Sequence, residues 1–579
     1  MRKKKNLFVL FLATLFSITQ ILAQESIIKG KIVAEDGEPL IGATIAIKGQ
    51  SGKGTATDVD GNFSLAASQG SVLVITYVGF ETTESIVTSS TMHIVLSPQS
   101  QILTEVVAVG YGVQKKVDMT GSVSTVKGDM LLKAPSPNLT NALAGKMTGV
   151  ISTQQSGKPG LDDPIFSIRG KSTLGDNSAL LLLIDLSIPS TKSNSALLLV
   201  DGIERSISKL DPNEIESVTI LKDAASAAVY GARGANGVIL VTTKRGGQGK
   251  TKINYTATFG LQSPTVVPKM MNAYEYAKYL NLALVNFGNL PRFTEEQIEG
   301  YRNGSSPSTD WWKETLKKRA GTQMHSLTAN GGNETTKYFI SLGLLDQDGL
   351  YDLSSFKKYN VRSNIDTKVT KEFTVSLDLA GRYEKISESA LGDGLFSSII
   401  GSKPTERAYV PTSVDPDGLG DNGLNTSPIG VTERVGYHKV ENSVTLKGVY
   451  EAPFLKGLKA SASFSFDRWF SRDKTFQTPF EFYKYDRILD KYNKTKSGGG
   501  INLYEGRAED QRLTYQASLM YDNSFLDQHN VSALFVLEES SYKYNVLSAA
   551  RVNFISPEIE EIFAGPTLDL TNGGSSSET

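Results

Sequence analysis

Hydrophobic and polar residues alternate one by one along much of the chain after Lys250. In the first such stretch the apolar face consists of Ile253, Tyr255, Ala257, Phe259 and Leu261. A period of two is the pattern of a β-strand with one apolar and one polar face. Eight further stretches repeat it, starting near Gln323, Thr335, Lys358, Phe373, Asn442, Gly457, Gln511 and Asn530. The pattern therefore predicts about nine antiparallel strands.

The connections between these strands are tight on one side and long on the other. The tight ones include Gly331-Gly332-Asn333, Thr370-Lys371 and Lys456-Gly457, and the long ones are residues 263–322, 385–441 and 471–510. Outer-membrane β-barrels have short turns on one side and long loops on the other, whereas a soluble sandwich has no reason to. A strand from Phe373 to Tyr383 also spans ~25 Å when tilted, which matches the apolar band of such a barrel. Residues 249–579 are therefore predicted to form barrel wall.

Nine strands are too few, and an odd number, for a closed barrel of this kind. An open barrel exposes two rows of unpaired backbone groups, and each group costs several kcal/mol in lipid. The polar run 571–579 does not have the pattern of a closing strand. We therefore expect an incomplete barrel, the N-terminal part of a larger one.

The sequence predicts two segments at the start of the chain, a signal peptide and a small domain. Residues 1–23 combine a basic start, an apolar run and a small residue before Gln24, which is the pattern of a secretory signal peptide. Residues 24–97 contain short β-rich runs separated by turn signals and predict a small β-sandwich. Within it, Asp58 and Asp60 before Gly61 resemble part of a calcium loop, but no glutamate follows at the required spacing, so an Asp-Gly turn is favoured.

The middle of the chain contains a linker followed by an α+β domain. In the linker, residues 98–114, the extended apolar segment 103–110 either adds to a partner's sheet edge or forms the first strand of the next domain. Residues 115–248 mix helices, capped by Asn138 and Asp223, with buried strands. One stretch, residues 177–182, recurs at 194–199. We interpret this as a local duplication covering residues 177–193.

Composition excludes several classes of protein. The 60 basic and 61 acidic residues nearly balance, so nothing favours nucleic acid as a partner. The chain has no cysteine, which removes disulfides, thiolate metal sites and a lipid-anchored cysteine. No segment after the signal peptide offers the ~18 consecutive apolar residues of a transmembrane helix. The fold class expected is mainly β.

In this order, the segments resemble the SusC/RagA family of TonB-linked outer-membrane transporters of the Bacteroidetes. The sandwich, with Gly42-Ala43-Thr44-Ile45 and residues 57–63, looks like the carboxypeptidase-regulatory-like module that opens these proteins. Residues 103–112 look like the family's linker, and residues 221–239 look like the signature that ends its plug domain. Relatives have one copy of the strand that is duplicated here.

The resemblance implies roles for particular residues. Residues 115–248 would be the plug inside the barrel, and the coupling segment, similar to a TonB box, comprises Thr104, Glu105, Val106, Val107, Ala108 and Val109. The plug signature comprises Asp201, Gly202, Lys222, Asp223, Tyr230, Gly231, Arg233, Asn236 and Gly237. The implied function is TonB-dependent import of a large nutrient, an oligosaccharide or a peptide. Its implied partners are the TonB-ExbB-ExbD complex and a SusD-like lipoprotein at the outer membrane, with the N-terminal module in the periplasm.

Two other functions were weighed. An outer-membrane binding or adhesion protein without transport would use the loops but would not need residues 104–109. An enzyme has little support, because the four histidines are isolated and lack zinc-ligand spacing, and Asp185 and Asp201 are better explained as turn residues. We expect no catalytic residue, metal or cofactor. All three tryptophans, Trp311, Trp312 and Trp469, fall in or beside long loops, where they could contact a ligand or pack the loops.

Overall fold

The computed structural model describes residues 26–578 with the exception of several gaps. These gaps are residues 35–36, 51–52, 79, 98–105, 110–111, 116–122, 135, 137, 155, 169–195, 208–209, 390–393, 425–426, 431–433, 487, 497–499, 526–528 and 568–569. The predicted signal peptide and the duplicated region 177–193, which includes Asp185, lie outside the described residues. The chain divides into two compact units, with the boundary along the sequence within residues 106–118, and each is described separately.

The first unit is a β-sandwich of seven strands. They are β1 (Ser26–Ala34), β2 (Thr44–Ile47), β3 (Gly54–Ala56), β4 (Asn62–Ala67), β5 (Val72–Thr76), β6 (Thr83–Ile86) and β7 (Thr91–Leu96). One sheet has the order β4-β1-β7 and the other β3-β2-β5-β6. Their inward residues form one apolar core, with Ile32, Ile45 and Leu73 fully buried. This confirms the predicted sandwich.

The segment around Asp58 is a turn, as predicted. The Asp58 carboxylate accepts hydrogen bonds from the backbone N–H groups of Asp60 at 3.0 Å and Asn62 at 2.8 Å. The hydrogen bond from Asn62 is the main cause that lowers the pKa of Asp58 below its usual value. Gly61 has a φ of +77°, which glycine adopts without strain. The N–H of Gly61 donates to the carbonyl of Asp58 at 3.0 Å and closes a β-turn between β3 and β4, which the carboxylate reinforces.

The second unit begins with the plug, whose elements surround a five-stranded sheet of order β10-β15-β16-β13-β14. Its strands are β10 (Val123–Lys127), β13 (Leu197–Val200), β14 (Ile203–Glu204), β15 (Ile215–Leu221) and β16 (Val238–Thr243), beside the hairpin β11 (Val150–Thr153) and β12 (Ile165–Ile168). Its helices are α2 (Gly128–Leu131), α3 (Leu139–Leu143), η3 (Pro212–Glu214), α4 (Ala224–Ala227) and η4 (Ala228–Gly234). Asn138 and Asp223 cap α3 and α4 as predicted.

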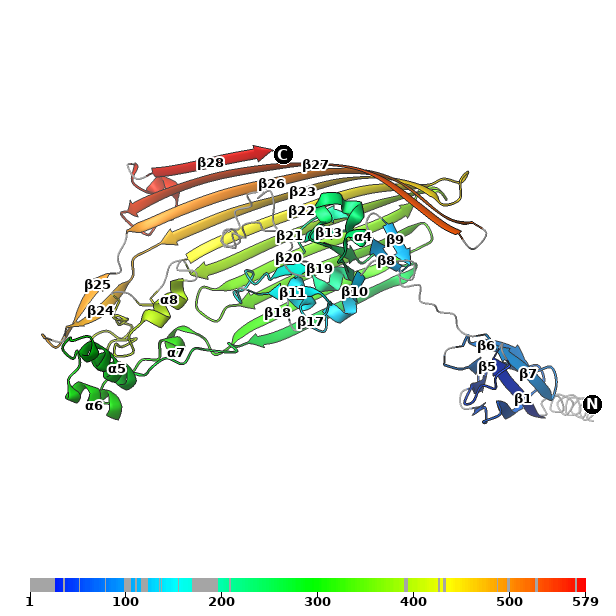
Figure 1. Cartoon of the computed structure of the whole chain (residues 1–579), viewed down its shortest axis with the longest axis horizontal. Helices are drawn as coiled ribbons and strands as arrows, with labels where there is room; N and C mark the ends of the chain where they lie inside the picture. The colour runs from blue at the N-terminus through cyan, green and yellow to red at the C-terminus, as the bar shows by residue number, and fades with distance from the viewer. Residues whose placement is uncertain are drawn as a thin grey trace, which may run out of the picture. The chain divides into compact units, whose positions relative to one another are not determined.

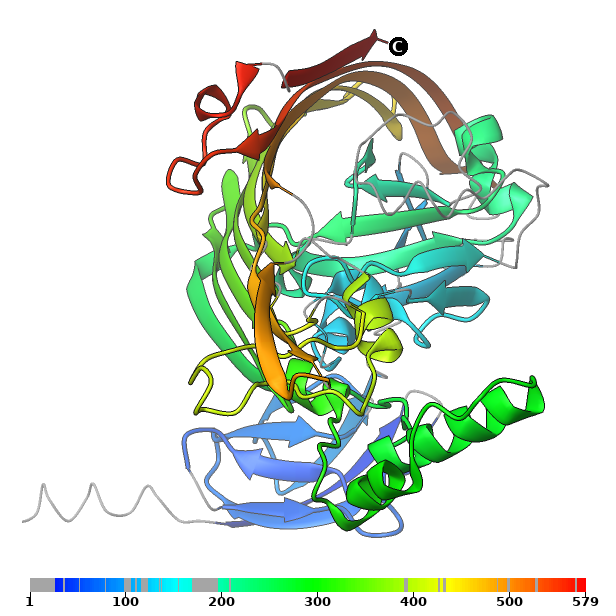
Figure 2. The ribbon, with the colours of Figure 1, turned by 90° about the vertical axis from the view of Figure 1, so that its left-hand side faces the viewer.

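The rest of the second unit is one antiparallel sheet of ten strands, in which neighbours in sequence are neighbours in space. They are β17 (Gly249–Gln262), β18 (Ala320–Gly332), β19 (Thr336–Asp348), β20 (Ser355–Lys368), β21 (Phe373–Ser389), β22 (Arg434–Glu451), β23 (Leu458–Gln477), β26 (Ile501–Phe525), β27 (His529–Phe554) and β28 (Leu570–Glu578). Figure 1 shows the strands side by side, and Figure 2 shows the sheet curving around the plug. This arc is the predicted portion of barrel wall.

The long connections gather at one end of this wall and contain their own elements. These are α5 (Ala273–Asn286), α6 (Glu295–Asn303), α7 (Trp311–Thr315), α8 (Gly394–Gly401), η5 (Ile562–Ala564) and the hairpin of β24 (Glu481–Asp486) and β25 (Lys491–Lys496). Both α5 and α6 begin with capping boxes, at Asn272 and Thr294. In the described part of the chain, none of the helices has the length and apolar character needed to cross a membrane.

Two sequence expectations about the wall were wrong. The loops expected at residues 385–441 and 471–510 are shorter, because β21 and β22 stay paired as far as Ser389 and Arg434, and β23 and β26 as far as Gln477 and Asn502. About nine strands were predicted, yet residues up to Glu578 of the polar run form a tenth, β28, along Lys543–Arg551 of β27. Both errors have one cause: ladder hydrogen bonds come from the backbone, so pairing continues where apolar side chains stop.

The wall buries polar side chains and exposes apolar ones, which inverts the pattern of a soluble domain. On β19 and β20, Ile340, Leu342 and Val361 are exposed, whereas Ser341 and Asn364 are fully buried. The buried residues face the plug and the exposed ones form the outer surface. Such a wall suits an apolar solvent outside and a polar partner inside.

We predict that the sandwich core tolerates no large truncation. Ile32→Ala should lower the free energy of unfolding of the sandwich by about 3 kcal/mol, because it leaves a cavity among buried side chains. Ile27→Ala on the same strand is the control, since Ile27 is 64% exposed and Ile32 is 0% exposed. Hydrogen exchange of Asn62–Ala67 in the full chain measures both, and equal effects would contradict the assigned core.

Candidate functional site at the plug and inner wall

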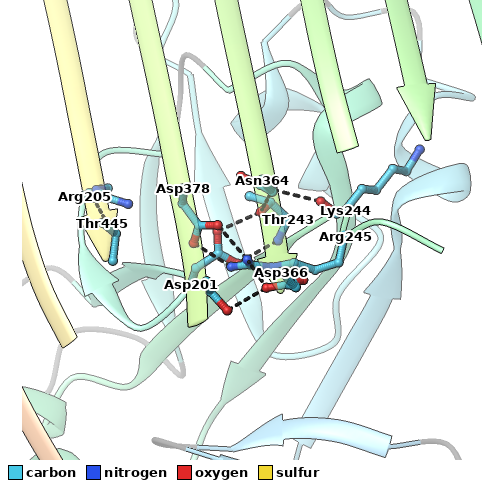
Figure 3. Close-up of polar contacts among 10 residues, drawn as sticks. Asp201, Arg205, Thr243, Lys244, Arg245, Asn364, Asp366, Asp378 and Thr445 are labelled. Atoms are coloured by element: carbon cyan, nitrogen blue, oxygen red, sulfur yellow. Dashed lines mark hydrogen bonds and ion pairs between the residues drawn. The ribbon is translucent and has the colours of Figure 1, made fainter. Parts of the chain in front are cut away.

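Arg245 lies on the short connection between β16 of the plug and β17 of the wall. Its Nη1 and Nη2 donate to the two carboxylate oxygens of Asp378 on β21, at 2.5 and 2.6 Å, in a bidentate pair. Nη1 also lies 3.3 Å from a carboxylate oxygen of Asp366 on β20 (Figure 3). Bidentate guanidinium–carboxylate pairs fix orientation as well as distance. The last plug residues before the wall are therefore held in one position.

Asp201 holds Thr243, the last residue of β16, two residues before Arg245. It follows β13 in a turn, with φ of +51°, and its carboxylate accepts hydrogen bonds from the N–H and hydroxyl of Thr243 at 2.9 and 2.7 Å. Asn364 of the wall donates to the same hydroxyl at 2.9 Å and to the carbonyl of Lys244 at 2.8 Å (Figure 3). Burial opposes the charge of Arg245, but Asp201 and Asp378 raise its pKa above the usual value.

Two further contacts join the plug to the wall by charged groups. Glu214, in η3, accepts from Arg362 Nε at 2.7 Å and from the Asn360 amide at 2.6 Å. Arg205, just after β14, donates to Asp467 at 2.6 Å and to the hydroxyl of Thr445 at 2.8 Å. A buried charge is costly unless it is paired and hydrogen-bonded, and here each has several partners. The plug is therefore attached through matched polar groups.

The plug-signature residues have structural roles in turns, caps and packing. Asp201 and Gly202 form the turn between β13 and β14, and Asp223 caps α4. Lys222 Nζ donates to the hydroxyl of Thr148 at 2.7 Å, and Tyr230 is buried in a core cluster with Leu221.

The glycines and polar residues that end the signature permit a sharp change of direction. Gly231 has φ of +55° at a kink within η4, and Gly237 has φ of +86°. A Cβ on Gly237 would lie 2.8 Å from Ile168, so the position requires glycine. Asn236 is half-buried in the same turn. Arg233 extends to the wall, where its guanidinium lies 2.6 Å from Glu538 of β27.

Part of the coupling segment forms a strand. Val106–Val109 is β8 and pairs with β9 (Gly112–Lys115) in a two-stranded sheet, whereas Thr104 and Glu105 lie outside the described residues. The sequence left two interpretations of this segment open: it adds to the edge of a partner's sheet, or it forms the first strand of the next domain. The observed pairing is with the chain's own β9. Coupling to an external partner remains a prediction.

The three tryptophans lie in packed environments. Trp311 and Trp312 are 4% and 8% exposed and belong to a cluster with Tyr351, Leu395 and Ile399. Trp469 lies inside β23, because that strand continues past the predicted loop boundary, and its Nε1 donates to Asp510 at 2.6 Å. These contacts favour loop and wall packing as their role, and ligand contact stays a prediction.

Of the predicted site residues, Arg233 and Gly202 contact the wall directly, Arg233 through Glu538 and the carbonyl of Gly202 by accepting from the Gln516 amide at 3.1 Å. The other residues that join plug and wall were not predicted. The sequence contains one indication of them. Arg362, Asp366 and Asp378 are charged residues on the polar face of strands with alternating polarity. No sequence motif marks the charged plug residues Arg205, Glu214 and Arg245 that pair with the wall. Among the described residues, no group of three or more His, Asp or Glu side chains is arranged to hold a metal ion.

Comparison with known proteins agrees with this architecture. The model of the TonB-dependent Receptor Plug Domain matches residues 115–238, and that of the CarboxypepD_reg-like domain matches residues 28–108. The chain is 33% identical over 365 residues to TonB-dependent receptor SusC of Bacteroides thetaiotaomicron, covering 62% of this chain and 34% of that protein. It is 30% identical over 513 residues to TonB-dependent receptor P26 of Formosa agariphila, covering 88% of this chain and 48% of the relative.

A solved structure shares the fold. The open-open state of the RagAB peptide importer superposes with a TM-score of 0.66 at 22% identity, covering 82% of this chain and 53% of that one. A plug domain inside an arc of antiparallel wall defines the class of TonB-dependent receptors. Within that class the chain belongs to the SusC/RagA family. It spans about half the length, or less, of the curated relatives it matches.

We predict that Asp378→Asn loosens the plug edge beside the wall. Losing the charged partner of Arg245 should cost about 2 kcal/mol, or about 30-fold faster hydrogen exchange over Val238–Thr243. Lys459→Met is the control, because the Lys459–Glu451 pair is exposed and joins wall strands only. Unchanged exchange in the Asp378 variant would mean that the ion pair does not hold the plug.

Proposed function

We propose that the protein takes part in TonB-dependent import of a large nutrient across the outer membrane. The observation that carries this proposal is the inverted wall, with apolar residues outside, polar residues inside and a plug attached to the polar side. A binding protein needs a surface but no movable domain in a lumen. A plug held by paired polar groups can be displaced and rehydrated, because water replaces the lost hydrogen bonds.

The proposal places the wall in the outer membrane and the N-terminal sandwich in the periplasm. The TonB-ExbB-ExbD complex would pull on the coupling segment by pairing with its backbone as an added strand. A SusD-like lipoprotein would cover the loop end. These partners rest on membership of the SusC/RagA family.

The nutrient class proposed is an oligosaccharide or a peptide. The similar solved structure is described as a peptide importer, which supports the peptide class by fold alone. An outer-membrane binding or adhesion protein without transport is the competing function. The relatives are TonB-dependent receptors rather than enzymes, and we propose no enzymatic activity.

We predict that removing residues 104–109 from the full-length protein in its native cell abolishes uptake while leaving the fold intact. The coupling segment transmits force, so its loss should reduce uptake at least about 100-fold, which corresponds to loss of an energised step. A milder variant, Val107→Pro, removes one backbone donor from β8 and should weaken strand pairing with the energising protein. Normal uptake with a correctly folded, deleted protein would favour the competing function, and loop-ligand binding measured in parallel serves as the control.

A further inference from the structure

The connection between β11 and β12 brings one turn of the plug against the loop end of the wall. The N–H of Leu161 donates to the carbonyl of Lys158 at 3.1 Å, which closes this turn. Within it, Gly160 has φ of +72°, and a Cβ there would lie 2.5 Å from the ring of Phe356 on β20. The backbone of the plug therefore packs directly on an aromatic ring of the wall.

The same turn makes a buried ion pair with the adjacent strand. Lys158 Nζ lies 3.3 Å from Oε1 of Glu388, near the end of β21, and both side chains are largely buried. The hydroxyl of Tyr351 donates to that same oxygen. Within the described part of the chain, the second oxygen, Oε2, is buried with no hydrogen-bond partner. One buried carboxylate thus depends on two donors from different parts of the protein.

Tyr351 belongs to what we call the outer-loop cluster, which packs three loop segments together. Its buried members are Trp311, Trp312, Tyr351, Leu395, Ile399 and Ala408. The ring of Tyr351 meets Phe396 edge to face, with ring centres 6.0 Å apart. The N–H of Lys317 donates to the carbonyl of Leu350, which ties the first long loop to the β19–β20 connection. Figure 1 shows α7 and α8 at the same end of the wall.

On the plug side, the turn is tied to a capped helix. Asp162 accepts hydrogen bonds from the side-chain amides of Asn138 and Asn141, each at 3.0 Å. Asn138 is the residue that caps α3, by accepting from the N–H of Thr140 at 2.9 Å. Movement of the turn would therefore act on the start of a helix in the plug core.

We infer that Glu388 is a positioning residue that couples the outer-loop cluster to the plug. Tyr351 and Lys158 together compensate the cost of burying its charge, so losing either donor leaves the carboxylate short of partners. The carboxylate must then recruit water, which separates it from the partner that remains. A rearrangement of the loops releases the plug turn, and movement of the plug turn loosens the loops. The functional role of this coupling rests on the proposed transport function, in which movements of the loops and the plug are linked.

Coupling between two sites is reciprocal, and this property provides the test. Tyr351→Phe removes only a hydroxyl from the loops, and Lys158→Met removes the charged ammonium group from the plug while keeping an unbranched side chain. Hydrogen exchange in the full chain is measured over residues 156–162 of the plug and over Gly394–Gly401 of α8. Each variant should accelerate exchange in both segments by at least about 5-fold, the effect of one lost buried hydrogen bond. Acceleration confined to the mutated side would overturn the inference.

Matched controls come from the same part of the wall. Tyr359→Phe removes a hydroxyl from an exposed outward residue, and Lys357→Met breaks a pair with Asp346 that joins wall strands only. Neither should alter exchange in the plug turn or in α8, and a change of 5-fold or more in both segments would overturn the specific role of Glu388.

A double-mutant cycle provides a second readout if one single variant unfolds locally. If both donors act through Glu388, Tyr351→Phe with Lys158→Met should accelerate exchange less than the product of the single effects, whereas independent effects would overturn the inference. Coupling that persists when uptake fails would overturn only the proposed function, and lost coupling with normal uptake would overturn only this inference.

Discussion

The second unit depends on one constraint: charged side chains on the concave face of the wall must find partners within the protein. Arg362, Asp378 and Asp467 project from wall strands into a space filled by the plug. Left without partners, each would carry a desolvation penalty of several kcal/mol. The plug supplies Glu214, Arg245 and Arg205 in positions that match them. Wall and plug are therefore each incomplete alone.

The two units are stabilised in different ways. The sandwich is an apolar core between two sheets, in which Ile32 and Ile45 are fully buried. The plug has a similar apolar core of its own, but it meets the wall through ion pairs and amides. An apolar interface resists separation in water because rehydrating it is unfavourable, whereas polar groups exchange protein partners for water at small net cost. This difference lets the plug remain folded while its contacts with the wall change.

The sequence predicted the wall because its signal is local. Alternation over Phe373–Ser389 and the turn residues that follow each strand identify strands without knowledge of their neighbours. The ends of the strands were mistaken because Ser389 and Arg434 pair through backbone groups that leave no hydrophobic pattern. Caps such as Asn138 were also predicted, since the capping residue and the helix are adjacent in sequence.

The polar contacts of the plug were harder to predict because their partners are distant in sequence. Arg245 and Asp378 are 133 residues apart, and no periodic pattern connects them. Trp311 and Trp312 were assigned to a loop correctly, but their burial depends on α8, which lies in another loop. A charged residue on the polar face of a strand indicates that a partner exists without indicating which one.

Asp201 combines two requirements that few side chains meet together. Its backbone conformation, with φ of +51°, is one that asparagine and aspartate tolerate better than longer or branched residues. Its charge lies close enough to Arg245 to raise the pKa of that guanidinium. Asparagine would preserve the turn without the charge, and glutamate would preserve the charge with a strained backbone. Of the twenty amino acids, aspartate alone meets both demands, so variation at this position should be far narrower than at an ordinary turn.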